Sequence, residues 1–396
     1  MAVLSKSYLQ NSGSLKCMDL IHPWSKSCVK GNLDFIFATS KGFFLFYTMM
    51  HGTQILFGLK NKKKMYIPKL LFNFMRSMSF GVSYASLFVF VNCLTQKILG
   101  KFNNVIFFYV VPFLCGLPIF FESPERRKIT VTTFVSMFLE SFYRVLINRK
   151  IIVRSKKFET LLFMLVNAFL MYSLRIRQEF HNKKDTLWFF TPVSPRKEDL
   201  SGNIIQNNEK KCPHKYSCIE NTIRDTLKYS AVGLVMAGVK FIVSRVMSPS
   251  KNRESFFQWR SLQMTFFISS YVFIFEAVNC YLCKLEGRYD AIHTLWSGLF
   301  SGISYWFSPN LQVVFTAATV LLKIQGDKLK KKYKLPNLPY PELSFVLSNM
   351  FLLQRIIFDF KSVPQFFYNI LLFATMNKSR ILIDAINKHY IVSRIL

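Results

Sequence analysis

Long apolar segments separated by short basic blocks constrain this chain more than any other feature of its sequence. Each segment is uncharged or nearly so and approaches the roughly 20 residues that a helix needs to cross a bilayer. The segments are 42–59, 77–96, 102–121, 129–147, 160–174, 229–247, 261–281, 291–307, 311–322 and 343–358. Backbone N–H and C=O groups find no water in hydrocarbon, so a segment that crosses must be helical. We therefore predict an all-α, polytopic membrane bundle.

The composition of the 396-residue chain agrees with this interpretation. The hydrophobic fraction is 51%, the charged fraction is 18%, and 43 Phe and 17 Tyr stand beside only 15 Gly and 14 Pro. A disordered chain would hold far fewer aromatic residues. The net charge of +31 lies in blocks between apolar segments. Nucleic-acid-binding proteins carry such charge on a polar surface instead, so we expect no nucleic-acid partner.

The segments differ in how well they fit a transmembrane helix. The best candidates are 77–96, 102–121, 261–281 and 291–307. Three others are short or carry charges, and could be interfacial or re-entrant: 129–147, 311–322 and 343–358. We expect between about six and ten spans.

A polar connector rich in Pro and Asn divides the chain into two halves. The eight cysteines do not form a secreted disulfide pattern, and we expect them to be reduced. The predicted regions are an N-terminal cap (1–41), a first transmembrane unit (42–174), the connector with a second cap (175–228), a second transmembrane unit (229–360) and a C-terminal amphipathic tail (361–396).

Short motifs recur in the two halves at a nearly constant offset. The pairs are His22–Cys28 with Cys212–Cys218, Arg76-Ser77 with Arg260-Ser261, Val91-Asn92-Cys93 with Val278-Asn279-Cys280, and Gly116 with Gly302. Several matches in the same order are hard to obtain by chance, so we predict an internal repeat. Membrane transport proteins are often built from two such units. The bundle is thus expected to consist of two tandem related halves.

Small residues in segment 291–307 predict close helix packing. Gly298 and Gly302 form a G-x-x-x-G motif, with Ser301 beside them. Residues four apart share one face of a helix, and missing side chains let another backbone approach closely. Gly116 occupies the place of Gly302 in the first half, whereas Pro112 replaces the other glycine and should break the motif there.

Charged residues inside the apolar segments are few. Glu140 and Arg144 are four residues apart, so they can neutralise each other on one helix face. Glu276 has no such near partner in the sequence. We therefore take Glu276 as the best single candidate for a polar site within a span.

Each half begins with a short motif that contains proline, cysteine and histidine. The motif residues are His22, Pro23 and Cys28 in the first half, and Cys212, Pro213, His214 and Cys218 in the second. Closed zinc sites usually combine two closely spaced ligand pairs. Here a Cys-x5-Cys pair stands nearly alone, and nothing nearby completes four ligands. We predict structured interfacial caps without metal or other cofactor.

Motifs for catalysis are missing from the sequence. We find no Gly-rich phosphate loop, no G-x-S-x-G elbow, no H-E-x-x-H and no paired-carboxylate spacing. We therefore expect the protein not to be an enzyme, and name no catalytic residue. A membrane-bound lipid-modifying enzyme is the weakest alternative, because it would need a His or Asp cluster at one interface.

Short motifs along most of the chain also match a known family. They are Leu4-Ser5-Lys6-Ser7, His22–Cys28, Lys97–Phe102, His293 with Ser297–Ser304, and Leu338–Pro341. With these residues the chain resembles the transmembrane protein 135 family, which is similar to the inner-membrane translocase and peroxisomal-membrane-protein superfamily. The resemblance implies a multi-span protein of mitochondrial and peroxisomal membranes, linked to mitochondrial fission, peroxisome function and lipid or cholesterol handling. The family's N-terminal cysteines are fewer here, with only Cys17 and Cys28.

Two other functions stay open at this point. A channel or translocase-like transporter would need polar residues facing a lumen, and Glu140, Arg144 and Glu276 are the few candidates. An insect-type chemoreceptor would fit the length and the many Phe, but would have seven spans without a repeat.

The basic blocks suggest what the protein contacts. Lys62, Lys63 and Lys64 form one such block, and each Lys near an anionic leaflet contributes about 1 kcal/mol of binding. We expect membrane lipids, organelle-dynamics proteins and a second copy of the chain as candidate partners.

Overall fold

The computed structural model describes most of the chain. The described residues are 16–60, 67–103, 105–181, 188–191, 212, 214, 216–247 and 259–395. They form helices, and no strand occurs among them. The predicted all-α class is thereby confirmed. The basic block Lys62–Lys64 and the cap residue Pro213 lie outside the described residues.

The chain forms two compact units. Unit 1 consists of residues 1–151 and 337–396, and unit 2 consists of residues 152–336. The chain therefore leaves unit 1, builds the whole of unit 2 and then returns to unit 1.

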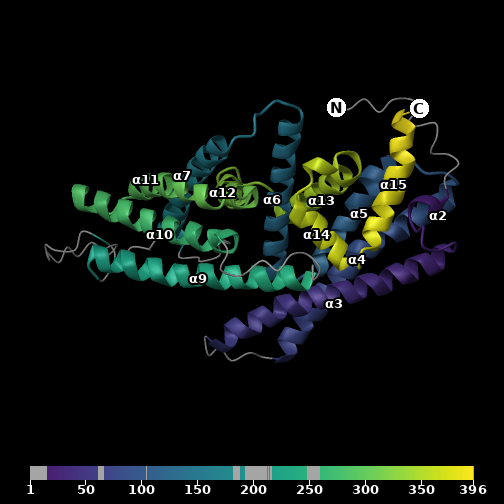
Figure 1. Cartoon of the computed structure of the whole chain (residues 1–396), viewed down its shortest axis with the longest axis horizontal. Helices are drawn as coiled ribbons and strands as arrows, with labels where there is room; N and C mark the ends of the chain where they lie inside the picture. Colours follow the sequence, from purple (N-terminus) through teal and green to yellow (C-terminus); the bar gives the residue numbers. More distant parts are fainter. Residues whose placement is uncertain are drawn as a thin grey trace. The chain divides into compact units, whose positions relative to one another are not determined.

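Unit 1 contains both ends of the described chain. Its helices are α2 (Cys17–Leu20), α3 (Cys28–Lys60), α4 (Ile67–Leu99), the π-helix η2 (Ile106–Val110), α5 (Val111–Gly116), the 3-10 helix η3 (Leu117–Phe121), α6 (Pro124–Asn148), α13 (Tyr340–Phe358), the 3-10 helix η5 (Phe360–Ser362), α14 (Gln365–Ala374) and α15 (Lys378–Ile395) (Figure 1).

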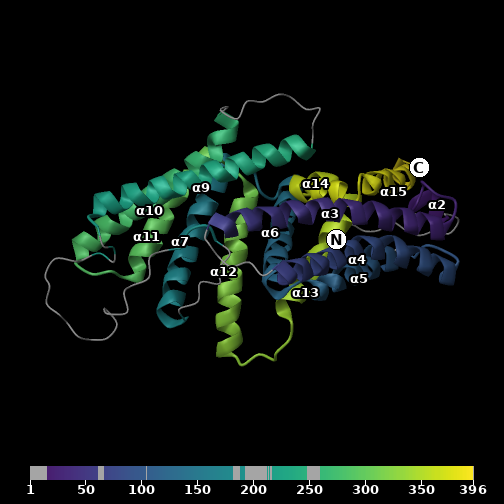
Figure 2. The ribbon, with the colours of Figure 1, turned by 90° about the horizontal axis from the view of Figure 1, so that it is seen from below.

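Unit 2 has its own set of helices. Its helices are α7 (Lys156–His181), α9 (Cys218–Met247), α10 (Trp259–Glu286), α11 (Ala291–Ser301), the 3-10 helix η4 (Gly302–Phe307) and α12 (Leu311–Lys332). Figure 2 shows a pair of long neighbouring helices in each unit, α3 beside α4 and α9 beside α10.

Each unit contains one further helix that packs over equivalent neighbours, and we call it the covering helix. In unit 1, α13 packs against α5 and α6; in unit 2, α7 packs against α11 and α12. Yet α7 lies in the first predicted half and α13 in the second. The compact units therefore differ from the predicted regions 42–174 and 229–360, because packing assigns these two helices to the opposite unit. Hydropathy along the sequence contains no information on which partner a helix chooses.

The C-terminal segment is part of the core of unit 1. Helix α14 packs against α3, and α15 packs against α2. Phe367, Leu382 and Ile386 are buried, and a Cβ at Gly42 of α3 would collide with the Ala374 carbonyl of α14. The described part of the C-terminal segment, residues 361–395, thus packs against the N-terminal helices.

Four of the described helices are long and apolar enough to cross a bilayer: α4, α6, Lys156–Arg177 of α7 and Leu262–Glu286 of α10. The predicted segments 77–96 and 261–281 lie within this group. By contrast, 102–121 consists of short π, α and 3-10 pieces, and the α-helix in 291–307 stops at Ser301. Helix α6 qualifies although it contains Glu140 and Arg144.

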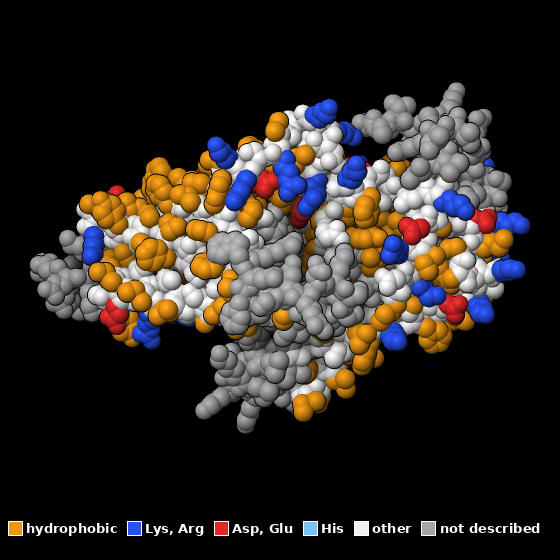
Figure 3. All heavy atoms as spheres, viewed as in Figure 1, with side chains coloured by type: hydrophobic (Ala, Val, Ile, Leu, Met, Phe, Trp, Pro, Cys, Tyr) orange, Lys and Arg blue, Asp and Glu red, His pale blue; other side chains and the backbone are white. Residues whose placement is uncertain are grey.

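The surface also suits a lipid environment. Apolar side chains cover wide parts of the exposed surface in Figure 3, and Phe72 and Ile219 are 62% and 74% exposed. Soluble monomers rarely expose apolar patches on this scale. The length of the four helices and this surface identify an integral membrane protein.

Candidate functional site

Four side chains that are distant in the sequence meet at the cap of unit 1. Cys17 begins α2, His22 lies in the following loop, Cys28 begins α3, and Cys93 lies within α4. Their Sγ and ring-nitrogen atoms all lie within 4.8 Å of one another. The His22 Nε2 atom is 3.3 Å from Cys28 Sγ. The cap therefore contains three thiols and one imidazole around one point.

Unit 2 contains an equivalent cluster. Cys212 and His214 precede α9, Cys218 begins α9, and Cys280 lies within α10. These ligand atoms also lie within 4.8 Å of one another. His214 Nε2 is 3.3 Å from Cys280 Sγ, and the Sγ atoms of Cys212 and Cys218 are 3.7 Å apart.

Both histidines are held in the same orientation. The Nδ1 atom of His22 is 2.8 Å from the Ser25 carbonyl oxygen, and that of His214 is 2.7 Å from the Tyr216 carbonyl oxygen. A carbonyl oxygen can only accept, so Nδ1 carries the proton and donates. In a neutral ring, Nε2 then presents its lone pair to the sulfur atoms.

The structure corrects the expectation that nothing completes four ligands. The missing residues are Cys93 and Cys280, which belong to the repeated Val-Asn-Cys motif. The sequence did not predict these two residues as ligands, because each lies on the second long helix of its unit, far along the chain from the cap. The predicted repeat also places Cys212 opposite His22. In the structure, the residue that corresponds to His22 is His214.

The thiols of the two clusters are free. A hydrogen bond with Cys93, together with burial, raises the pKa of the Cys17 thiol above its ordinary range. Burial, with smaller contributions from Cys218, raises the pKa of the Cys212 thiol to about 11.

The predicted small residues lie at close helix contacts. A Cβ on Gly302 would lie 2.6 Å from Met164 Cα, and one on Gly298 would lie 3.0 Å from the Asn167 carbonyl oxygen. In unit 1, a Cβ on Gly116 would lie 3.0 Å from Val346 Cα. The contacts are with the covering helices, α7 and α13. Unit 1 therefore has a close approach at Gly116 even though Pro112 interrupts the glycine motif.

A buried asparagine joins three helices in each unit. In unit 1, Tyr84 Oη donates to Asn349 Oδ1 over 2.6 Å, and Asn349 Nδ2 donates to the Pro112 carbonyl over 2.9 Å. This network connects α4, α13 and α5.

The network in unit 2 has the same pattern. Tyr271 Oη donates to Asn167 Oδ1 over 2.7 Å, and Asn167 Nδ2 donates to the Gly298 carbonyl over 2.6 Å and to Ser301 Oγ over 3.1 Å. Sequence reasoning missed both asparagines. The available indication was that Tyr84 and Tyr271 occupy the same place in the repeat register.

Of the predicted charged residues, Glu140 and Glu276 are buried and Arg144 is partly buried. Arg144 Nη2 is 2.8 Å from Glu140 Oε1, so the two side chains form an ion pair on α6. Glu276 is buried in α10. Glu276 lies one helical turn before the cluster residue Cys280 in α10. The structure describes no joint polar site formed by Glu140, Arg144 and Glu276.

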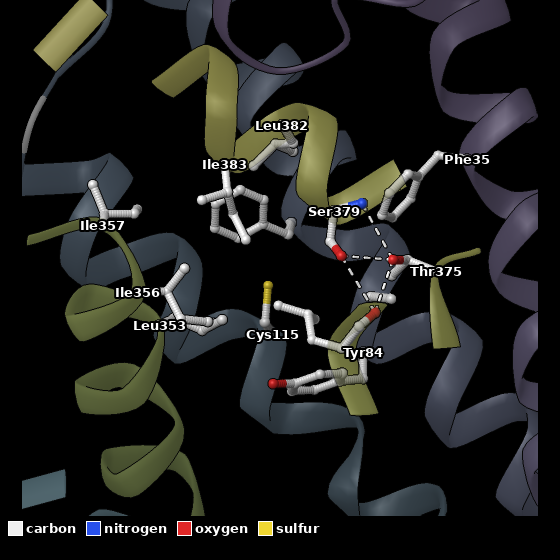
Figure 4. Close-up of a pocket in the computed structure, with 13 residues that line it drawn as sticks. Phe35, Tyr84, Cys115, Leu353, Ile356, Ile357, Thr375, Ser379, Leu382 and Ile383 are labelled. Atoms are coloured by element: carbon white, nitrogen blue, oxygen red, sulfur yellow. Dashed lines mark hydrogen bonds between the residues drawn. The ribbon is translucent and has the colours of Figure 1, made fainter. Parts of the chain in front are cut away.

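Unit 1 also contains a partly open apolar cavity, shown in Figure 4. Its walls come from α3, α4, α5, α13, α14 and α15: Phe35, Tyr84, Ala85, Phe88, Cys115, Leu353, Ile356, Ile357, Leu371, Thr375, Ser379, Leu382 and Ile383. The Thr375 hydroxyl donates to the Leu371 carbonyl, and its oxygen lies 2.7 Å from Ser379 Oγ, within hydrogen-bond distance. The hydroxyl groups of the wall already have hydrogen-bond partners: those of Thr375 and Ser379 bond each other and the backbone, and that of Tyr84 bonds Asn349.

Comparison with known proteins places the first cluster within a described region. Residues 14–147 match the model of the N-terminal cysteine-rich region of Transmembrane protein 135. The matched range contains Cys17, His22, Cys28 and Cys93 and covers about one third of the chain. It confirms the family resemblance, whereas the wider superfamily relation stays a prediction. No solved structure matches the chain.

Proposed function

We propose that this chain, which carries the cysteine-rich region of the transmembrane protein 135 family, is a non-enzymatic membrane protein of mitochondria or peroxisomes. Its proposed role is to influence mitochondrial fission, peroxisome function and the balance of lipid or cholesterol. The resemblance to the transmembrane protein 135 family motivates the choice of organelle, and the four apolar helices support the membrane setting.

One observation carries the lipid part of this proposal, namely the cavity in unit 1. Apolar side chains form most of its wall, and the hydroxyls of Thr375 and Ser379 already have partners. A ligand that enters gains by removing its own apolar surface from water and needs few hydrogen bonds. An acyl chain or a sterol ring system has this chemistry.

The location is tested by imaging a tagged copy together with mitochondrial and peroxisomal markers. We expect overlap with one or both markers. Cells that lack the protein should show longer or shorter mitochondria, and a tagged copy should restore their normal length. Signal confined to the plasma membrane would contradict the proposal and favour a chemoreceptor.

The cavity is tested with a photoactivatable fatty acid or cholesterol probe on the purified protein. Leu353 lines the cavity, so Leu353→Trp should fill it and lower cross-linking. Leu347 lies on the same helix but is 55% exposed, so Leu347→Trp is the matched control and should cross-link like the unmodified protein. Equal cross-linking of both variants would exclude this cavity as the lipid site.

A further inference from the structure

We infer that each unit holds one Zn²⁺ ion in a closed site of three cysteines and one histidine. The ligands are Cys17, His22, Cys28 and Cys93 in unit 1, and Cys212, His214, Cys218 and Cys280 in unit 2. This inference is independent of the proposed organelle and of the lipid cavity.

The spacing of the ligand atoms fits a tetrahedral zinc site. Zn–S bonds of about 2.3 Å and Zn–N bonds of about 2.0 Å give tetrahedral edges of about 3.8 Å between two sulfurs and about 3.5 Å between sulfur and nitrogen. Cys212 and Cys218 Sγ are 3.7 Å apart, and both imidazole Nε2 atoms are 3.3 Å from a sulfur. A disulfide would instead bring two sulfurs to about 2.05 Å.

The orientation of the histidines is a second, independent observation. Histidines that bind metal usually donate their other ring N–H to a carbonyl or carboxylate, which fixes the tautomer. His22 and His214 both do so, through Ser25 and Tyr216. Each ring therefore directs its free nitrogen at the thiols.

The two clusters use different loops to reach the same arrangement. Four residues separate Cys17 from His22, but only one separates Cys212 from His214. Cys28 and Cys218 nevertheless both begin a long helix, and Cys93 and Cys280 both lie on the next long helix. Both clusters therefore contain the same kinds of side chain at equivalent places on the helices, although the loops differ. This is expected if both clusters bind the same ligand.

The donor set selects the metal. Thiolate and imidazole favour Zn²⁺, whereas Mg²⁺ and Ca²⁺ prefer oxygen ligands. Binding converts three thiols to thiolates and releases three protons, leaving a complex with one net negative charge. Four protein ligands leave no open position for water or substrate, so each site is structural.

The metal would connect the cap to a helix that is remote in the sequence. In unit 1 it joins the segment before α3 to Cys93 near the end of α4, and in unit 2 it joins the segment before α9 to Cys280 near the end of α10. A short cap has little apolar surface to bury, and a structural zinc ion supplies folding free energy directly.

The test measures the zinc content of the full chain, purified in detergent from zinc-replete cells without chelator. We expect two zinc ions per chain, one for each cluster. Cys93→Ser and Cys280→Ser should each retain one, and the double variant should retain none. Cys115 is buried in unit 1 but lies outside both clusters, so Cys115→Ser is the matched control and should retain two.

A spectroscopic measurement on the unmodified chain keeps the inference testable if a variant does not fold. Replacing zinc by Co²⁺ should produce sulfur-to-cobalt charge-transfer bands and the strong visible bands of tetrahedral cobalt. Unmodified protein that contains no zinc and gives no such bands would overturn the inference. So would a Cys212–Cys218 disulfide found by mass spectrometry, or unchanged zinc content in the double variant.

Discussion

Units 1 and 2 form similar internal contacts, but the covering helix is α13 in unit 1 and α7 in unit 2. In unit 2, Gly298 and Gly302 let α7 approach α11 and η4 directly. In unit 1, the corresponding stretch is divided into η2, α5 and η3, with Pro112 where unit 2 has Gly298. Both units still place a buried asparagine of the covering helix on a backbone carbonyl of this stretch.

Pro112 shows how unit 1 forms this helix contact without a glycine at the place of Gly298. Proline has no N–H, so it cannot bond the carbonyl four residues earlier. That carbonyl belongs to Phe108, and it accepts a hydrogen bond of 3.0 Å from Gln354 Nε2 on α13. Unit 1 therefore replaces close glycine packing with an additional side-chain hydrogen bond to the helix backbone. The comparison teaches that contact between helices in a membrane can be secured through small residues or through exposed carbonyls.

The largest expected difference between the units concerns the shared glycine position. Gly302→Ala would place Cβ 2.6 Å from a backbone atom, whereas Gly116→Ala would leave 3.0 Å. We expect Gly302→Ala to lower the free energy of unfolding by about 3 kcal/mol and Gly116→Ala by about 1 kcal/mol. Thermal unfolding in detergent measures both.

Gly326→Ala is the control for these substitutions. Gly326 lies in α12, and nothing lies within 4 Å of the position of its Cβ. Alanine has the better helix propensity, so this change should be neutral or stabilise by about 1 kcal/mol. Equal losses at positions 302 and 116 would contradict the contrast between the units.

The asparagine networks should, in contrast, be equally important in both units. Asn349→Leu and Asn167→Leu each leave a tyrosine hydroxyl and a carbonyl without their partner. We expect each change to cost about 2 kcal/mol, because buried polar groups are then unsatisfied. Tyr84→Phe and Tyr271→Phe remove one hydrogen bond each and should cost about 1 kcal/mol. A large effect in one unit alone would show that the two networks differ in importance.

The role of Pro112 can be examined with a double-mutant cycle. Gln354→Leu should cost about 1 kcal/mol, since it removes the partner of the Phe108 carbonyl. In a Pro112→Ala background, the new N–H can bond that carbonyl, and the same change should cost less. Additive losses would mean that Pro112 and Gln354 act independently.

The smallest expected effect concerns the ion pair of each covering helix. In unit 1, Arg127 Nη1 is 3.1 Å from Glu342 Oε1, and both side chains are mostly buried; in unit 2, Arg177 Nη2 is 3.7 Å from Asp327, whose side chain is 54% exposed. Glu342→Gln should lower stability by about 0.5–1 kcal/mol, and Asp327→Asn by a negligible amount. The unfolding temperature measures both effects. Because the pair in unit 1 is mostly buried, added salt should change the loss caused by Glu342→Gln only slightly.

Local features of the fold could be predicted from the sequence. Backbone groups in lipid require helices, so apolar length alone indicates where α4 and α10 run. Gly302 could be predicted as a close contact because its missing side chain has one simple consequence. The ion pair of Glu140 with Arg144 follows from helical spacing.

Contacts between distant segments could not be predicted in this way. Cys93 was recognised as part of a repeated motif, but its distance from Cys28 along the chain hid their contact. Asn349 and Asn167 are single polar residues in apolar helices, and nothing in their neighbourhood distinguishes them from lipid-facing ones. The choice of α13 for unit 1 and of α7 for unit 2 depends on tertiary packing, which hydropathy does not encode.

The return of the chain to unit 1 after residue 336 has a consequence for biogenesis. A ribosome that has translated as far as Pro336 has polymerised every residue of unit 2, while unit 1 still lacks α13, α14 and α15. Until the rest of the chain is made, the face of α5 around Gly116 lacks its covering helix α13. The part of the protein that is made first is therefore the part that is finished last.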